Sequence, residues 1–201
     1  MNKYVKNILV LTIITVLAGA CLGYIYDITK EPIAAAALQA KQEAYKAVFP
    51  DASSFDADSS VNYDSLNEAL TNNALSNDEI IEVLNASDAS GNLLGYVITV
   101  VSKEGYGGDI TVSVGIKSDR TVIGVEILDI SETAGLGMNA TTDEFKGQFA
   151  GKNVTSFSYT KNSKSADYEI DAISGATITT NAMTNAVNAA LCCVDSIGGG
   201  M

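Results

Sequence analysis

The sheet-forming part of this 201-residue sequence is LLGYVITVVSKEGYGGDITVSVGIKSDRTVIGVEILDI, residues 93–130. Its first nine residues, 93–101, are mostly apolar or β-branched, which predicts a well-buried strand. Over residues 110–116, Ile and Val alternate with Thr, Ser and Gly, and the alternation returns over residues 122–130 after a polar turn at residues 117–120. We therefore predict an antiparallel hairpin inside an α+β fold.

Helices are predicted on both sides of these strands. Residues 33–48, IAAAALQAKQEAYKAV, are rich in helix formers, with Pro32 suited to the first turn and Pro50 ending the helix. A closing helix is predicted over residues 181–194, which carry apolar side chains on one face.

The remaining segments give weaker signals. Residues 51–75 are rich in Asp, Ser and Asn, which predicts a surface loop with short helices. Period-two patterning begins near Ile80, and residues 154–159 and 168–173 predict further strands.

The N-terminal segment has the length and composition of a membrane span. Residues 7–26, NILVLTIITVLAGACLGYIY, carry no charge, and about 20 apolar residues are what a helix needs to cross a bilayer. Lys3 and Lys6 precede the run and Asp27 follows it, so the positive-inside rule predicts a cytoplasmic N-terminus. We predict that residues 1–30 form a single-pass anchor in the cell (inner) membrane and that residues 31–201 form an extracytoplasmic domain.

Two other interpretations of the N-terminus stay open. In a cleaved signal peptide, Ala18-Gly19-Ala20 would supply the small residues of the cleavage site. In a lipoprotein, Cys21 would be acylated, although Ala18 stands where leucine is usual and the apolar run continues past Cys21.

Composition excludes several classes of function. The formal charge is −12, which argues against binding nucleic acid. The sequence has no histidine, which excludes an imidazole base, a Ser-His-Asp triad and histidine-ligated haem. The three cysteines, Cys21, Cys192 and Cys193, have the spacing of neither a disulfide framework nor a metal site, so we expect packing residues and no metal. Redox chemistry would therefore need an organic cofactor.

The stretch that points to chemistry is DAISGATITT, residues 171–180. We predict that a strand ends here, a turn of small residues follows, and a helix begins with Thr179 or Thr180 as its N-cap. Unpaired N–H groups at a helix N-terminus favour a phosphate, and Gly175 lets a ligand approach the backbone. These residues alone are compatible with a phosphate-binding site and with a strand–helix connection that binds no ligand.

Asp171-x-x-Ser174-Gly175-Ala176-Thr177 resembles the flavinylation motif of the FMN-binding domain family. Members of that family include the G subunit of the Rnf ferredoxin:NAD⁺ oxidoreductase and the C subunit of the sodium-translocating NADH:quinone oxidoreductase. The resemblance implies that FMN is joined through a phosphoester to Thr177.

A second segment strengthens this resemblance. Residues 131–137, SETAGLG, are similar to the family's Glu-Thr-Pro-Gly-Leu-Gly loop, with Ala134 where proline is common. The turn at residues 105–108, GYGG, also fits, and the family core covers about residues 93–191. The resemblance implies a pocket formed by both segments. Its cofactor-binding residues would be Thr177, Ser174, Gly175, Ala176, Glu132, Thr133, Gly135, Leu136 and Gly137.

The resemblance also implies a role. The chain would be an electron-carrier subunit of a membrane ion-translocating ferredoxin:NAD⁺ oxidoreductase, with no catalytic residues of its own and no activity alone. Its expected partners are the integral-membrane, iron–sulfur and flavin subunits of that complex, and a flavin transferase during maturation. The alternatives are the C subunit of the sodium-translocating quinone reductase, a stand-alone extracytoplasmic flavin carrier, and a non-redox anchored module.

Overall fold

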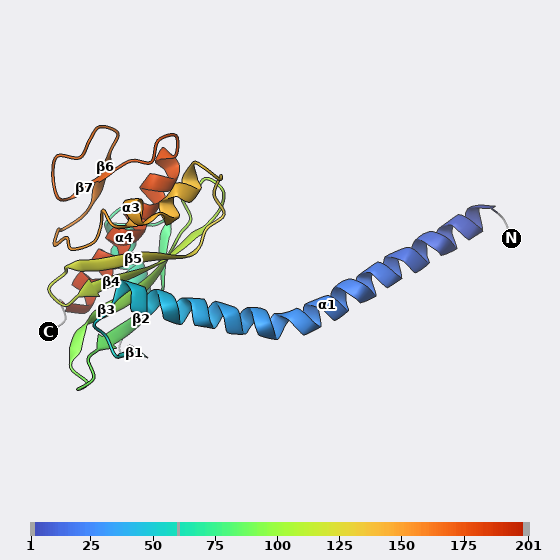
Figure 1. Cartoon of the computed structure of the whole chain (residues 1–201), viewed down its shortest axis with the longest axis horizontal. Coiled ribbons are helices and arrows are strands. Elements are labelled where there is room, and N and C mark those ends of the chain that lie inside the picture. Colours follow the sequence, from blue (N-terminus) through green and yellow to red (C-terminus); the bar gives the residue numbers. More distant parts are fainter. Residues whose placement is uncertain (1–2, 60, 199–201) are drawn as a thin grey trace. The chain divides into compact units, whose positions relative to one another are not determined.

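The computed structural model describes residues 3–59 and 61–198 (Figure 1). By its internal contacts the chain forms two compact units, Met1–Lys41 and Gln42–Met201. The first unit consists of most of helix α1, Lys3–Val48, and the last turns of that helix belong to the second unit.

Helix α1 is continuous where the sequence predicts a break. We expected a new helix to begin at Pro32, but Pro32 lies inside a 46-residue helix. Proline removes one backbone hydrogen bond, and a helix whose side chains are exposed on all faces can leave the freed carbonyl to its surroundings. The helix therefore tolerates Pro32.

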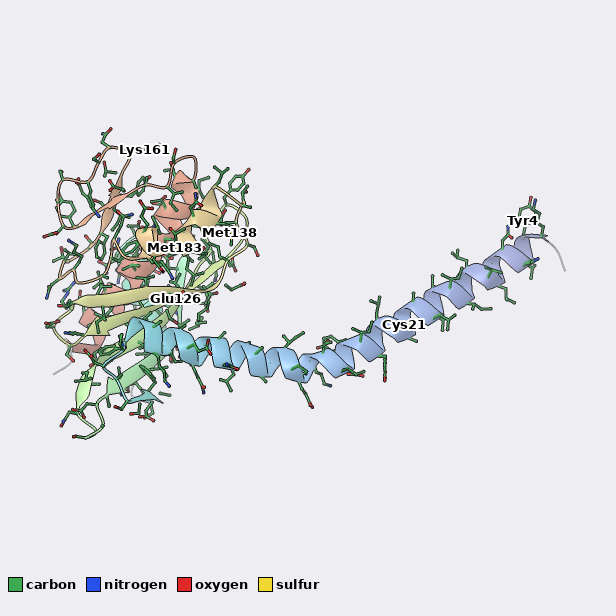
Figure 2. The ribbon with its side chains drawn as sticks, viewed as in Figure 1. Tyr4, Cys21, Glu126, Met138, Lys161 and Met183 are labelled. Atoms are coloured by element: carbon green, nitrogen blue, oxygen red, sulfur yellow. The ribbon has the colours of Figure 1, made fainter. Side chains whose placement is uncertain are left out.

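The apolar part of α1 is exposed along its whole length. The helix is long and apolar enough to cross a membrane, and its most apolar stretch buries nothing within the structure. Tyr4 and Cys21 project outward from the ribbon in Figure 2. Apolar side chains that face outward need an apolar environment, which fits the predicted anchor.

The second unit is built on a five-stranded sheet of order β1-β2-β3-β4-β5, with every neighbouring pair antiparallel. Its strands are β1 (Ser54–Ala57), β2 (Asp78–Ser87), β3 (Leu93–Ser102), β4 (Ile110–Lys117) and β5 (Val122–Asp129). The predicted hairpin is confirmed, with Val114 opposite Val125 in the β4–β5 register. The sequence did not predict β1, whose four residues, SFDA, lack an alternating pattern.

Helices and two short strands complete the unit. They are α2 (Tyr63–Asn72), the 3₁₀ helix η1 (Gly137–Thr141), α3 (Asp143–Lys146), β6 (Ser158–Thr160), β7 (Glu169–Asp171) and α4 (Thr177–Gly198). Strands β6 and β7 are shorter than predicted and pair in parallel, apart from the main sheet. The predicted α+β class, an apolar N-terminal helix followed by an antiparallel-sheet domain, is confirmed.

The sheet has apolar cores on both faces. Helix α4 packs across β2, β3 and β4 and buries Met183, Val187 and Leu191 (Figures 1 and 2). On the other face, the end of α1 contributes Tyr45 and Val48 to a smaller core. Packing on the sheet holds the N-terminus of α4 in place. The DAISGATITT stretch leads into this N-terminus and includes the first turn of the helix.

Of the three cysteines, Cys193 has the packing role that we expected, whereas Cys192 is partly buried and Cys21 is exposed. Cys21, Cys192 and Cys193 are all free thiols. Cys193 lies in the α4 core, and burial raises the pKa of its thiol to about 12. It therefore stays protonated and unreactive at neutral pH.

Candidate functional site

The two segments singled out in the sequence meet at one pocket. It has a volume of about 590 Å³, within the usual range for small-molecule sites. Three pieces of backbone surround it: the turn after β3, the loop before η1 and the start of α4. The lining residues are Tyr106, Glu132, Thr133, Leu136, Gly137, Gly175, Ala176, Thr177, Ile178 and Thr179.

Helix α4 begins earlier than predicted. It starts at Thr177, so Thr179 and Thr180 are not its N-cap. The Thr180 hydroxyl instead accepts a hydrogen bond from the Ile173 amide (3.0 Å) and donates to the Ala176 carbonyl (2.9 Å). Thr180 therefore joins the end of the preceding segment to the first turn of the helix, and Thr177 becomes the first helical residue.

The early start of α4 places helix N–H groups beside the pocket. The first N–H groups of an α-helix have no intrahelical acceptor, and the helix dipole makes this end partly positive. Thr177, Ile178 and Thr179 occupy these positions and line the pocket. This end of the pocket is therefore suited to an anion such as a phosphate.

The loop at residues 131–137 packs closely on the start of α4. A Cβ on Gly137 would lie 2.5 Å from Glu132 Oε2, 2.7 Å from Thr179 Oγ1 and 2.8 Å from Glu132 Cβ, so a side chain there would displace Glu132 or Thr179. Gly175 has a φ of +75°, and its α-carbon faces the Leu136 side chain. The two segments thus form adjoining walls of one pocket.

The pocket contains one carboxylate and no lysine or arginine among its described lining residues. Glu132 Oε1 accepts hydrogen bonds from the backbone amides of Tyr106 (2.7 Å) and Gly107 (3.3 Å). The rim is apolar: Tyr106 is 72% exposed, Ile178 51% and Leu136 42%. An apolar mouth with a polar helix terminus at one end suits a flat aromatic ligand that carries a phosphate.

Most residues predicted for the site line this pocket. Seven of them do so: Glu132, Thr133, Leu136, Gly137, Gly175, Ala176 and Thr177. Gly135 and Ser174 are both exposed and lie outside this lining. The predicted set omitted Tyr106, Ile178 and Thr179. The turn motif at residues 105–108 was a signal for Tyr106. Ile178 and Thr179 were missed because α4 begins earlier than predicted, which places both residues in the first turn beside the pocket.

Ser174 and Asp171 line a second pocket, of about 400 Å³. Gln148 fixes the backbone of Asp171, accepting from its amide (2.8 Å) and donating to its carbonyl (3.3 Å). The Asp171 carboxylate accepts from the Lys164 amide (2.6 Å). The DAISGATITT stretch therefore has two faces, with Thr177 on the first pocket and Ser174 on the second.

The described residues include no cluster of His, Cys, Asp or Glu that could hold a metal ion. Comparison with known proteins indicates the class of group that this pocket takes. Residues 105–192, which contain every wall of the pocket, match the model of the FMN-binding domain.

Relatives of the whole chain define the family. The G subunit of an ion-translocating oxidoreductase complex from Methanosarcina acetivorans is 32% identical over 193 residues, 94% of this chain and 94% of the relative. The G subunit of a proton-translocating ferredoxin:NAD(+) oxidoreductase complex from Clostridium ljungdahlii is 39% identical over 57% of this chain and 61% of the relative. The chain belongs to the family of G subunits of ion-translocating oxidoreductase complexes, as the sequence resemblance implied.

A solved structure also resembles the chain. NqrC from Shewanella oneidensis matches it with a TM-score of 0.46 and 25% identity, covering 53% of each chain.

The residues of the pocket fit FMN. The start of α4 offers backbone donors for its phosphate, and Thr177 offers a hydroxyl beside them. Leu136, Ile178 and Tyr106 offer apolar surface for its ring system.

Proposed function

We propose that this chain carries FMN joined through a phosphoester to Thr177 and serves as an electron-carrier subunit of an ion-translocating ferredoxin:NAD⁺ oxidoreductase. The observation that carries the proposal is the position of Thr177. It is the first residue of α4, half-buried, and it lines a pocket whose rim is apolar. FMN, when bound, supplies the electron-accepting and electron-donating chemistry.

The covalent link is a transfer from FAD, catalysed by a separate flavin transferase with Mg²⁺. The Thr177 oxygen forms a bond to the phosphorus of the FMN half of FAD. The bond from this phosphorus to the bridging oxygen breaks, AMP leaves, and the hydroxyl proton passes to solvent. The product is FMN esterified to Thr177, with no change in the oxidation state of the flavin.

The remaining residues of the pocket hold and shield the group. Helix N–H groups at the start of α4 stabilise the phosphodiester charge. Leu136 and Ile178 exclude water from the ring, and Glu132 keeps the loop before η1 joined to the turn that carries Tyr106. Within its complex, the subunit would pass electrons to other subunits.

The covalent bond suits the predicted location. With the N-terminus in the cytoplasm, the pocket would lie outside the cell membrane, away from the cytoplasmic pool of flavin. A phosphoester prevents the loss of the cofactor there and leaves the ring unmodified. The partners would be the integral-membrane, iron–sulfur and flavin subunits of the complex.

The direct test uses protein purified from its native membrane. After denaturation and gel electrophoresis, we expect a band with flavin fluorescence, and we expect Thr177→Ala to abolish it. Thr133→Ala is the matched control, because Thr133 is a threonine of the same pocket in the opposing loop. A parent band without fluorescence would contradict the proposal, as would a Thr177→Ala band that still fluoresces.

A further inference from the structure

One wall of the pocket is a turn that has little side-chain packing of its own. Residues 105–108 join β3 to β4, and three of these four residues are glycines. The fourth, Tyr106, lines the pocket and is largely exposed. The position of this wall therefore depends on hydrogen bonds from its neighbours.

Glu104 precedes the turn and connects it to two other elements. Its Oε1 accepts from Asn77 Nδ2 (2.9 Å), and its Oε2 accepts from Asn181 Nδ2 (3.1 Å) and Asn185 Nδ2 (2.6 Å). Asn77 lies just before β2, and the other two amides belong to α4. Hydrogen bonds to an ionised carboxylate are about twice as strong as neutral ones.

The two α4 amides lie on the same face of the helix as the proposed flavin attachment site. Thr177, Asn181 and Asn185 are spaced by four residues, and side chains four apart stack on one face of an α-helix. Glu104 is thus bonded to the helical stripe that begins at Thr177. It does not line the pocket, so it acts through the turn.

We propose that Glu104 is a positioning residue that holds the Tyr106 turn at a fixed place relative to the Thr177 stripe of α4. The inference rests on the proposed function, because the purpose of a fixed wall is to orient the flavin ring. Glu132 fixes the opposite side of the same turn, through the amides of Tyr106 and Gly107. The carboxylates of Glu104 and Glu132 therefore connect the three backbone segments that form the walls of the pocket.

The proposal requires a carboxylate. A glutamine at position 104 keeps the size of the side chain but has one acceptor oxygen in place of two. Its amide group would face either the Asn77 donor or the two α4 donors, and one of the two connections would be lost. Glu104→Gln is therefore the informative substitution.

The first measurement is hydrogen exchange on protein without flavin, in the Thr177→Ala background. We expect Glu104→Gln to speed amide exchange at Tyr106 and Gly107 by about ten-fold, since local opening sets the exchange rate. Glu79→Gln is the control, because Glu79 is exposed and pairs with Lys103 beside the same end of β3. Unchanged exchange in Glu104→Gln would overturn the proposal whether or not FMN binds.

The second measurement is the visible circular dichroism of the flavinylated protein. We expect Glu104→Gln to lower the intensity of the flavin bands by about half, as a ring held by a mobile wall samples more orientations. Flavin content and melting temperature should stay near the parental values. In the double variant Glu104→Gln, Asn181→Asp, the new amide can donate to the new carboxylate while Asn185 Nδ2 still faces a donor, so the dichroism should be restored in part.

The outcomes separate this inference from the proposed function. Parental dichroism in flavin-loaded Glu104→Gln overturns the positioning role and leaves the attachment at Thr177 intact. A parent protein that carries no flavin refutes the proposed function, and the ring-orienting role of Glu104 with it.

Discussion

Helix α4 carries threonines near its start that have different surroundings. Thr177 is half-buried and lines the pocket, whereas Thr180 and Thr184 are buried against the rest of the unit. The hydroxyls of the buried pair are bonded to backbone groups within the chain. Residue type therefore does not decide the role of a threonine here. The surroundings of its hydroxyl do, so Thr177 and Thr180 should respond to substitution in opposite ways.

The largest expected effect separates Thr177 from Thr180. Thr177→Ala should remove all covalent flavin and leave the melting temperature nearly unchanged, because Thr177 is half-buried and at a helix end. Flavin content and thermal unfolding, measured on the same native preparations, check this expectation.

Thr180→Val should do the reverse. It leaves the buried Ile173 amide without its acceptor, which costs about 1–3 kcal/mol of unfolding free energy, while flavin stays attached. Loss of flavin in Thr180→Val at full folding, or strong destabilisation in Thr177→Ala, would contradict the difference between these two threonines.

The next effect concerns the close contact between the pocket walls. Gly137→Ala adds a methyl group within 2.7 Å of Glu132 Oε2 and Thr179 Oγ1, so we expect a loss of about 1–3 kcal/mol in stability. Urea unfolding measures the loss. Ala134→Ser, at an exposed position of the same loop, is the control. Parental stability in Gly137→Ala would show that the walls are less closely packed than described.

A smaller effect concerns Asp78, a buried carboxylate near Glu104. In the described part of the chain, neither of its oxygens has a hydrogen-bond partner. Burial raises the pKa of Asp78 from 3.8 to about 6, and the charge of Glu104 adds to the rise. Folding therefore favours the protonated form. The stability that this gives is complete below pH 3.8 and is lost as the pH rises through about 6.

Asp78→Asn should remove this pH dependence. We expect the variant to be more stable than the parent by about 1–2 kcal/mol at pH 8, with the gain fading below about pH 4. The control has the opposite sign: the hydrogen bond from Asn92 lowers the pKa of Asp88, so Asp88→Asn should lose stability above pH 3.8. Equal stability of Asp78→Asn and the parent at every pH would contradict a raised pKa of Asp78 in the folded protein.

The sequence predicts the sheet well because alternation reports which face of a strand is buried. The β4–β5 hairpin follows from this pattern. The apolar length of α1 follows from its uninterrupted run of uncharged residues. The DAISGATITT and SETAGLG segments were expected to share a pocket, and contacts such as Gly137 with Thr179 place them together.

Other features depend on tertiary contacts that local patterns do not contain. Strand β1 exists because β2 pairs with it, and its own residues show no alternation. Helix α4 begins at Thr177 because the Thr180 amide already donates to the Ala176 carbonyl (3.0 Å), a bond within the segment that the residue pattern did not reveal. Glu104 is connected to Asn181 and Asn185 across about eighty residues of sequence, a distance that no spacing rule covers.

Peptide mass spectrometry of the protein from its native membrane would decide whether Thr177 carries FMN. We expect the peptide containing Thr177 to gain the mass of FMN less one water, and fragmentation to place this gain on Thr177. A native protein in which this peptide has its unmodified mass, or in which the flavin lies on another residue, would contradict this expectation.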